Sequence, residues 1–233
     1  MRKSILSTLV MLGTAGSLTA CDFEQPSAGC IVQEGQWFVK YEALDAPTGV
    51  DCAGSEPLAG DDLGVFKFAN PDQGTSQLVI RPASLAALGQ FDETNAYAGL
   101  QSIGSLETTT DADDFCGATG FSSAAVNANT GAYAGAAAEA ITYQFDNVKV
   151  YSNPGAPGTQ MSGELTYTNN GCVSRYVWRA MWPSTGCDPD AVPDETNGPD
   201  TCGEGSGLNP DFKVRCDEEL AHCVLTDNVP SFK

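Results

Sequence analysis

Histidine is almost absent from this chain, which has one, His222, among 233 residues. Imidazole is the usual general base near neutral pH, so the chain offers a single histidine as the base of a catalytic triad. The nucleophile elbow of serine hydrolases is also missing, because residues 120–124 read Gly-Phe-Ser-Ser-Ala and lack the final glycine. No phosphate-binding loop or dinucleotide fingerprint occurs. We therefore predict no catalytic residues and no cofactor.

Long hydrophobic runs are missing as well. The apolar stretch at residues 5–12 is too short to span a bilayer core of about 30 Å. It follows Arg2 and Lys3 and precedes Leu-Thr-Ala-Cys at residues 18–21, which is the pattern of an export signal. The cysteine at the cleavage point resembles the lipobox of bacterial lipoprotein precursors. This resemblance implies cleavage before Cys21, with a diacylglyceryl group on its sulfur and a further acyl chain on its amino group.

Basic residues are scarce, with 11 Lys and Arg against 30 Asp and Glu. Removal of residues 1–20 takes away two basic residues and no acid, so the charge of the mature side chains becomes −21. A surface this acidic repels phosphate backbones and anionic headgroups, and we predict no nucleic-acid partner. Membrane attachment must then come from the acyl chains on Cys21, of which two or more anchor stably.

The cysteines support the same interpretation. Nine is an odd number for an exported chain, in which free thiols are rare. Lipidation of Cys21 leaves eight for disulfides, which persist outside the reducing cytosol. About a hundred pairings are open, although loop entropy favours the short closures Cys187 with Cys202 and Cys216 with Cys223. The predicted disulfide cysteines are Cys30, Cys52, Cys116, Cys172, Cys187, Cys202, Cys216 and Cys223.

Metal binding is the competing interpretation of these residues. A structural zinc site is disfavoured because the chain has no Cys-x-x-Cys pair and a single histidine. Calcium is a sharper alternative, since an irregular acidic segment offers the oxygen ligands that calcium prefers. The spacing fails the EF-hand pattern, because proline stands where that loop requires glycine. The weak calcium candidates are Asp188, Asp190, Asp194 and Asp200.

Short strands dominate the rest of the chain. Residues 36–44, 76–81 and 141–151 alternate apolar and polar side chains, and residues 64–68 form a short apolar run. Residues 84–88 before Gly89 predict one helical turn, whereas residues 117–140 show no clear period and are expected to form a loop. We predict an all-β fold, either an antiparallel sandwich or a partly open barrel.

A hairpin at Asn170-Gly171 is the best-specified element, because both positions of a type I′ turn need positive φ. Pairing outward from this turn sets Trp178 opposite Gly163 and places Glu164 diagonally near two arginines. With the preceding strand it predicts a three-stranded meander. The aromatic side chains Tyr176, Trp178 and Trp182 then share one face, which we expect to be buried.

The expected organisation is a signal peptide over residues 1–20, a lipidated tether over 21–29, a β-rich domain over 30–182 and an acidic, cysteine-rich irregular segment over 183–233. This acidic, Ala- and Gly-rich, disulfide-rich body behind a lipobox resembles lipoproteins of predatory and gliding delta-proteobacteria, the myxobacterial type. The resemblance transfers only Cys21 as a functional residue. An outer-membrane location is favoured over the inner membrane, although Asp22 is the residue that retains lipoproteins in the inner membrane of enteric bacteria.

Three functional hypotheses follow. The first is a non-enzymatic envelope lipoprotein that serves as a binding or structural module, with an envelope protein or a glycan as partner. The second is an envelope hydrolase with paired carboxylates, for which Glu164 is the weakest of candidates because nearby arginines keep it ionised. The third is calcium-dependent adhesion through the acidic segment.

Overall fold

The computed structural model describes residues 29–50, 52, 57–94, 97–129, 138–191 and 201–233. Most of this chain is β-strand, with one short helix, α1 (Ala83–Leu88), followed by the 3-10 turns Gly89–Phe91 and Tyr97–Leu100. The strands are β1 (Gly35–Ala43), β2 (Thr48–Gly49), β3 (Gly60–Asn70), β4 (Thr75–Pro82), β5 (Ser102–Leu106), β6 (Phe115–Thr119), β7 (Ala124–Ala128), β8 (Glu139–Asn153), β9 (Ala156–Asn169), β10 (Cys172–Met181), β11 (Val214–Asp217) and β12 (His222–Leu225).

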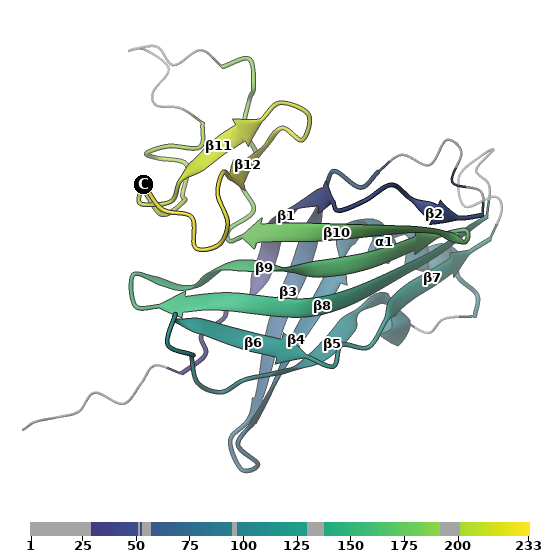
Figure 1. The fold of residues 1–233 in the computed structure, drawn as a ribbon, viewed down its shortest axis with the longest axis horizontal. Helices are drawn as coiled ribbons and strands as arrows, with labels where there is room; N and C mark the ends of the chain where they lie inside the picture. Colours follow the sequence, from purple (N-terminus) through teal and green to yellow (C-terminus); the bar gives the residue numbers. More distant parts are fainter. Residues whose placement is uncertain (1–28, 51, 53–56, 95–96, 130–137, 192–200) are drawn as a thin grey trace, which may run out of the picture.

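Ten of these strands form one antiparallel sheet that closes on itself (Figure 1). Eight of them follow the order β1-β3-β4-β5-β6-β8-β9-β10, and β1 pairs with β10 to complete the circuit. The other two are short: β2 pairs with β10 and β7 with β8. The seam between β5 and β6 has only two residue pairs, so the closure is uneven. The all-β prediction is confirmed, and its form is an irregular ring rather than a sandwich or a regular barrel. Closure removes most of the free strand edges that favour aggregation.

The core lies inside the ring, where alternate residues of each strand point inward. The largest side chains there include Trp37, Phe145 and Trp178, all fully buried. The Phe145 and Trp178 rings meet edge to face, with centroids 5.7 Å apart, a favourable aromatic geometry. Trp182 is half-buried against the same core. The expectation that the aromatic face of β10 is buried in the core is confirmed.

The hairpin of β9 and β10 has the predicted register. Asn170 and Gly171 both adopt positive φ, as a type I′ turn requires. Trp178 lies opposite Gly163, and a Cβ added at that glycine would come within 2.7 Å of the indole ring. The glycine therefore leaves the space that the tryptophan fills. β8 completes the predicted meander by pairing along β9.

The expectation of a loop over residues 117–140 is wrong in part. β6 extends to Thr119 and β7 occupies Ala124–Ala128, and both pair with β8. Their inward side chains are small, including Ala118 and Ala124, so the sequence shows little hydrophobic contrast along them. Pairing with the long neighbouring strand β8 stabilises β6 and β7, although their own sequences show no clear strand pattern.

Gly89 directly follows α1, but it is not the left-handed glycine that commonly ends a helix. Its φ of −59° is right-handed, so it does not terminate the helix through a left-handed turn. A Cβ at this position would lie 2.2 Å from a methyl group of Leu100. The glycine is required by close packing.

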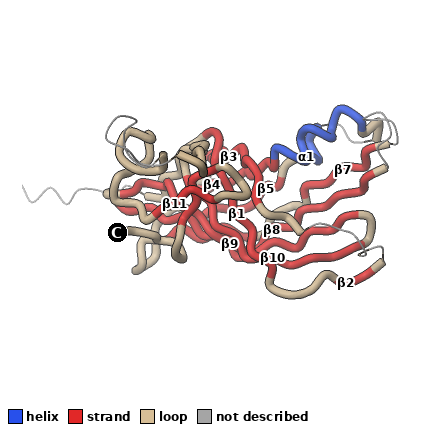
Figure 2. Tube along the Cα trace, turned by 90° about the horizontal axis from the view of Figure 1, so that it is seen from above, coloured by secondary structure: helices blue, strands red, loops and turns tan. Residues whose placement is uncertain are grey.

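The C-terminal residues pack against the outside of the ring, at the end of the molecule opposite α1 (Figures 1 and 2). β11 and β12 form a small hairpin whose His222 ring stacks on Phe38 of β1, with centroids 4.0 Å apart. Near the chain end, Ser231 exchanges hydrogen bonds with the buried Gln160 amide of β9. Stacking and hydrogen bonding together hold this hairpin segment on β1 and β9.

Candidate functional site

The first described residues are fixed firmly to the ring. Cys30 is 1% exposed and forms a disulfide with Cys116 of β6, with a Cα–Cα distance of 5.8 Å. Its backbone N–H donates to the carbonyl of Thr108 at 3.2 Å, and the Lys67 ammonium of β3 donates to its carbonyl. Cys21 and residues 22–28 lie outside the described residues. A chain that arrives from Cys21 thus meets an anchored point only a few residues later.

All eight cysteines that the structure describes form disulfides. Two cross-link the ring, Cys30–Cys116 and Cys52–Cys172, and two lie in the C-terminal segment, Cys187–Cys216 and Cys202–Cys223. The pairing favoured by loop length is therefore wrong. Cys216 and Cys223 already face each other across β11 and β12, so their backbones are joined by the hairpin itself. Each sulfur instead fastens a separate irregular stretch to that hairpin.

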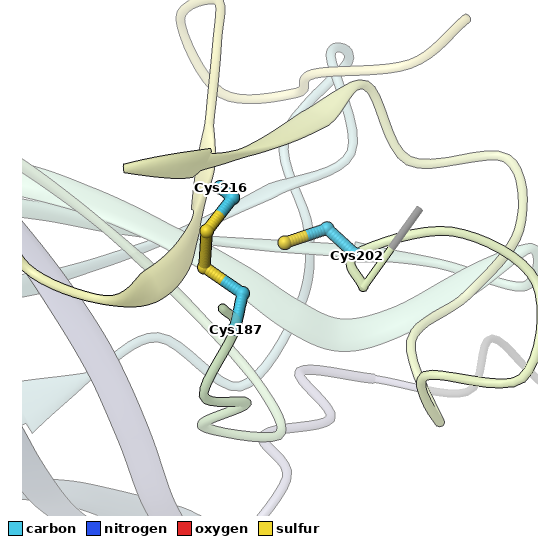
Figure 3. Close-up of side chains that lie close together, drawn as sticks. All are labelled: Cys187, Cys202 and Cys216. Carbon is cyan, nitrogen blue, oxygen red and sulfur yellow. A yellow bond between two sulfur atoms is a disulfide. The ribbon is translucent and has the colours of Figure 1, made fainter. Parts of the chain in front are cut away.

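Cys202, which is bonded to Cys223, lies close to the Cys187–Cys216 disulfide (Figure 3). The sulfur atoms of Cys187, Cys202 and Cys216 lie within 4.8 Å of one another, and they form the one such group of metal-ligand types in the described chain. Zinc binds cysteine as thiolate. Because Cys187 is bonded to Cys216 and Cys202 to Cys223, these sulfurs are cross-links with no thiolate to offer a metal.

The acidic segment is only partly described. Asp188 and Asp190 are exposed, and one carboxylate oxygen of Asp188 accepts the backbone N–H of Asp190 at 3.0 Å. This contact is an Asx turn, a common local use of aspartate in loops. Asp194 and Asp200 lie outside the described residues. The calcium site stays a prediction.

His222 is held in a contact rather than displayed in a cleft. Its ring stacks on Phe38, and its Nδ1 lies 2.9 Å from the carbonyl oxygen of Leu220. Both interactions fix the imidazole between β12 and β1. His222 therefore helps to hold the C-terminal hairpin on β1.

The arginines of β10 have other partners than the one expected. Arg179 forms its ion pair with Glu42 of β1, and Arg175 with Asp45. Glu164 lies opposite Val177 and adds only to the negative charge around Arg175. The diagonal attraction inferred from the hairpin register is thus present at Arg175, while both arginines form their ion pairs with acids in or just after β1, which ring closure brings beside β10.

A group of tyrosines lies inside the ring. Burial raises the pKa of Tyr41, Tyr143 and Tyr167, in the last case to about 12. The nearby Asp61 carboxyl has its pKa raised by burial, although hydrogen bonds from Ser84 oppose the shift. The Tyr41 hydroxyl has no hydrogen-bond partner among the described residues. These hydroxyls stay neutral at physiological pH and serve the packing of the interior.

A hollow of about 880 Å³ is bordered by β1, residues 57–59 and the C-terminal hairpin, and its walls include Lys40, Arg215 and Asp217. Asp217 lies 2.7 Å from the Lys40 ammonium and 3.4 Å from the Arg215 guanidinium. Burial works against its ionisation, but the hydrogen bond and charge of Lys40 outweigh burial and hold the pKa of this carboxyl below its usual range. The Asp217 carboxylate is therefore an ionic link between β1 and β11.

Substitution Asp217→Asn should lower the free energy of unfolding by about 1 kcal/mol at pH 7, after allowance for solvent screening. A carboxyl whose pKa is lowered by folding stabilises the protein above its unfolded pKa of about 4 and loses this contribution as pH falls through the folded value. Denaturant titrations should thus show the difference at pH 7 and lose it near pH 2. Asp227→Asn, in the exposed pair with Lys213, should change little. A loss of equal size at both pH values would contradict the ionic role.

In the described part of the chain, no helix combines the length and apolar character needed to cross a membrane.

Fold and cross-links together define an all-β domain closed by disulfides. The chain belongs to the MlpA family, whose profile matches residues 35–183. It is 45% identical to "Putative lipoprotein MlpA" of Myxococcus xanthus over 243 aligned residues that cover 100% of both chains. The resemblance to myxobacterial lipoproteins is confirmed. No solved structure matches this chain.

The family match has a clear structural extent. It begins at the first residue of β1 and ends two residues after β10, so it spans the ring. The C-terminal hairpin with its two disulfides lies outside the profile, but the full-length alignment to the Myxococcus protein covers it.

Proposed function

We propose that this chain is an exported lipoprotein of the cell envelope, anchored by acyl chains on Cys21, that acts as a non-enzymatic binding or structural module. The observation that carries the proposal is the junction at Cys30, where a short tether from the lipobox cysteine ends on a buried disulfide. A lipid on Cys21 would then hold a rigid domain at the membrane surface. The name of the Myxococcus relative supports the anchor.

Non-enzymatic action is supported by how the chain uses its reactive side chains. His222 is stacked between two strands, and Trp178 fills the core. Asp61, a half-buried carboxyl with a raised pKa, accepts hydrogen bonds from the backbone and hydroxyl of Ser84. The partner is proposed to be an envelope protein or a glycan, because the acidic charge of the mature chain disfavours nucleic acids. The outer membrane is the proposed location.

The direct test presents the full-length chain, in detergent micelles, to purified peptidoglycan sacculi and envelope polysaccharides and, in a separate sample with a cross-linker, to solubilised envelope proteins. We expect the chain to co-sediment with one of these glycans, or to cross-link to an envelope protein, and to release no soluble fragments. Saturable release of reducing ends would overturn the proposal, and loss of that release in Glu164→Gln but not in Glu139→Gln would instead establish a carboxylate hydrolase. A heat-denatured sample of the same chain serves as the control for fragments that are released without the folded protein.

A further inference from the structure

The hairpin of β3 and β4 projects beyond the ring (Figure 1). Pairing between β1 and β3 ends where Gly35 meets Val65, so the last five residues of β3 continue past the end of β1. Phe66 and Phe68 lie in this extension, 41% and 60% exposed. Both point to the outer face, since the intervening Lys67 and the preceding Val65 point the other way. The projecting hairpin therefore displays two aromatic rings to the surroundings.

The outer face of this hairpin carries no acid of its own, although the chain has 30, and the one acid bonded to its free edge is Glu34, whose carboxylate accepts the backbone N–H of Lys67 at 3.2 Å. Its outward positions are Gly64, Phe66, Phe68 and Asn70 on β3, and Thr75, Gln77, Val79 and Arg81 on β4. Between residues 64 and 81 the one acid is Asp72, which lies in the turn. Arg81 has no ion pair among the described residues. The side chains of this face are therefore apolar or uncharged apart from Arg81, with Glu34 at its edge, on an acidic protein.

The predicted tether joins the ring beside the turn end of the same hairpin, on the face that carries Lys67 and Ala69. The Lys67 ammonium donates to the carbonyl of Cys30, and a hollow of about 260 Å³ is bordered by Gly29, Cys30, Ala69 and Asn70. The segment from Cys21 to Gly29 spans at most about 28 Å when extended. A bilayer that holds acyl chains on Cys21 must then lie within that distance of the turn end of the hairpin.

We propose that the β3–β4 hairpin enters the surface of the bilayer that holds the anchor, with Phe66 and Phe68 among the upper acyl chains and Arg81 near lipid phosphates. The inference rests on the lipid anchor proposed above. Phenylalanine on an apolar face is buried at the boundary between headgroups and acyl chains, and the anchor supplies a high local concentration of lipid, so weak contacts suffice. The consequence is orientation: two points of attachment, lipid and hairpin, fix which face of the ring looks away from the membrane.

The test uses the full lipidated chain with Phe68→Trp, reconstituted in phosphatidylcholine vesicles whose acyl chains are brominated. Bromine quenches tryptophan fluorescence only at contact. We expect the added indole to lose more than half of its fluorescence relative to vesicles without bromine, after subtraction of the wild-type signal. The matched control is Leu44→Trp, at a position that is 51% exposed just past the far end of β1, and its added indole should not be quenched.

The outcomes separate this inference from the anchor itself. Mass analysis of the same preparation reports lipidation of Cys21 independently. If the chain is lipidated and the indole added at position 68 is quenched no more than the one added at position 44, the hairpin insertion alone is overturned. An unlipidated chain would overturn both proposals. Protection of the indole at position 68 that grows with protein density but is insensitive to bromine would show contact with a second copy and would also overturn the insertion.

Discussion

Removal of the Cys30–Cys116 disulfide by the double substitution Cys30→Ala and Cys116→Ala should lower the free energy of unfolding by about 3–5 kcal/mol. The bond closes a loop with a sequence separation of 86 residues, and opening it restores much of the freedom of the unfolded chain. Both sulfurs are buried, so their loss also leaves space in the core. Thermal unfolding should show a midpoint lower by about 10 °C.

The matched control is the double substitution Cys202→Ala and Cys223→Ala, whose loop has a separation of 21 residues. Its shorter loop should make the loss smaller, by about 1 kcal/mol from the length difference alone. Equal losses for the two pairs would contradict the chain-entropy explanation. Proteolysis near residue 30 should increase only in the first variant, because only that variant frees the start of the domain.

Substitution Cys21→Ser should abolish lipid modification completely. A serine hydroxyl does not form the thioether that carries the diacylglyceryl group, and the lipobox cysteine is also the expected cleavage point. The precursor should therefore keep residues 1–20. The measurement is incorporation of an alkyne-labelled fatty acid during growth, followed by detection on the purified chain, which should fall to background.

The double variant at Cys30 and Cys116 serves as the cysteine control in this experiment and should keep its label. Undiminished labelling of Cys21→Ser would place the lipid on another residue and contradict the lipobox assignment. The control matters because the chain has eight other cysteines, each a conceivable site of thioester acylation. Resistance of the label to neutral hydroxylamine distinguishes the glyceryl oxygen esters and the amide expected on Cys21 from such thioesters.

Local pattern predicted those elements whose pairing is local. The β9–β10 hairpin follows from Asn170-Gly171 and from strict alternation on both strands, because the turn sets the register and the faces agree with it. Ring closure could not be predicted in this way. β1 pairs with β10 through residues far apart in the chain, such as Tyr41 with Trp178. Neither strand carries a sequence signal that identifies its distant partner.

The candidate surfaces were harder to predict than the fold. The run at residues 64–68 indicates a strand, but apolar side chains on both faces hide which face is buried. Phe66 and Phe68 are exposed there while Lys67 points inward, so hydrophobicity alone predicts the wrong face. The Lys40–Asp217 link has no sequence signal, because its partners are brought together by packing of the C-terminal hairpin on β1.

The most direct test of the lipid anchor is the intact mass of the mature chain purified from membranes, with sequencing of its amino-terminal peptide. We predict a chain that begins at Cys21 and carries a diacylglyceryl group and an N-linked acyl chain. The remaining eight cysteines should be oxidised as four disulfides. A mature chain that begins at another residue, or that bears a free thiol at Cys21, would contradict the anchor and the function proposed from it.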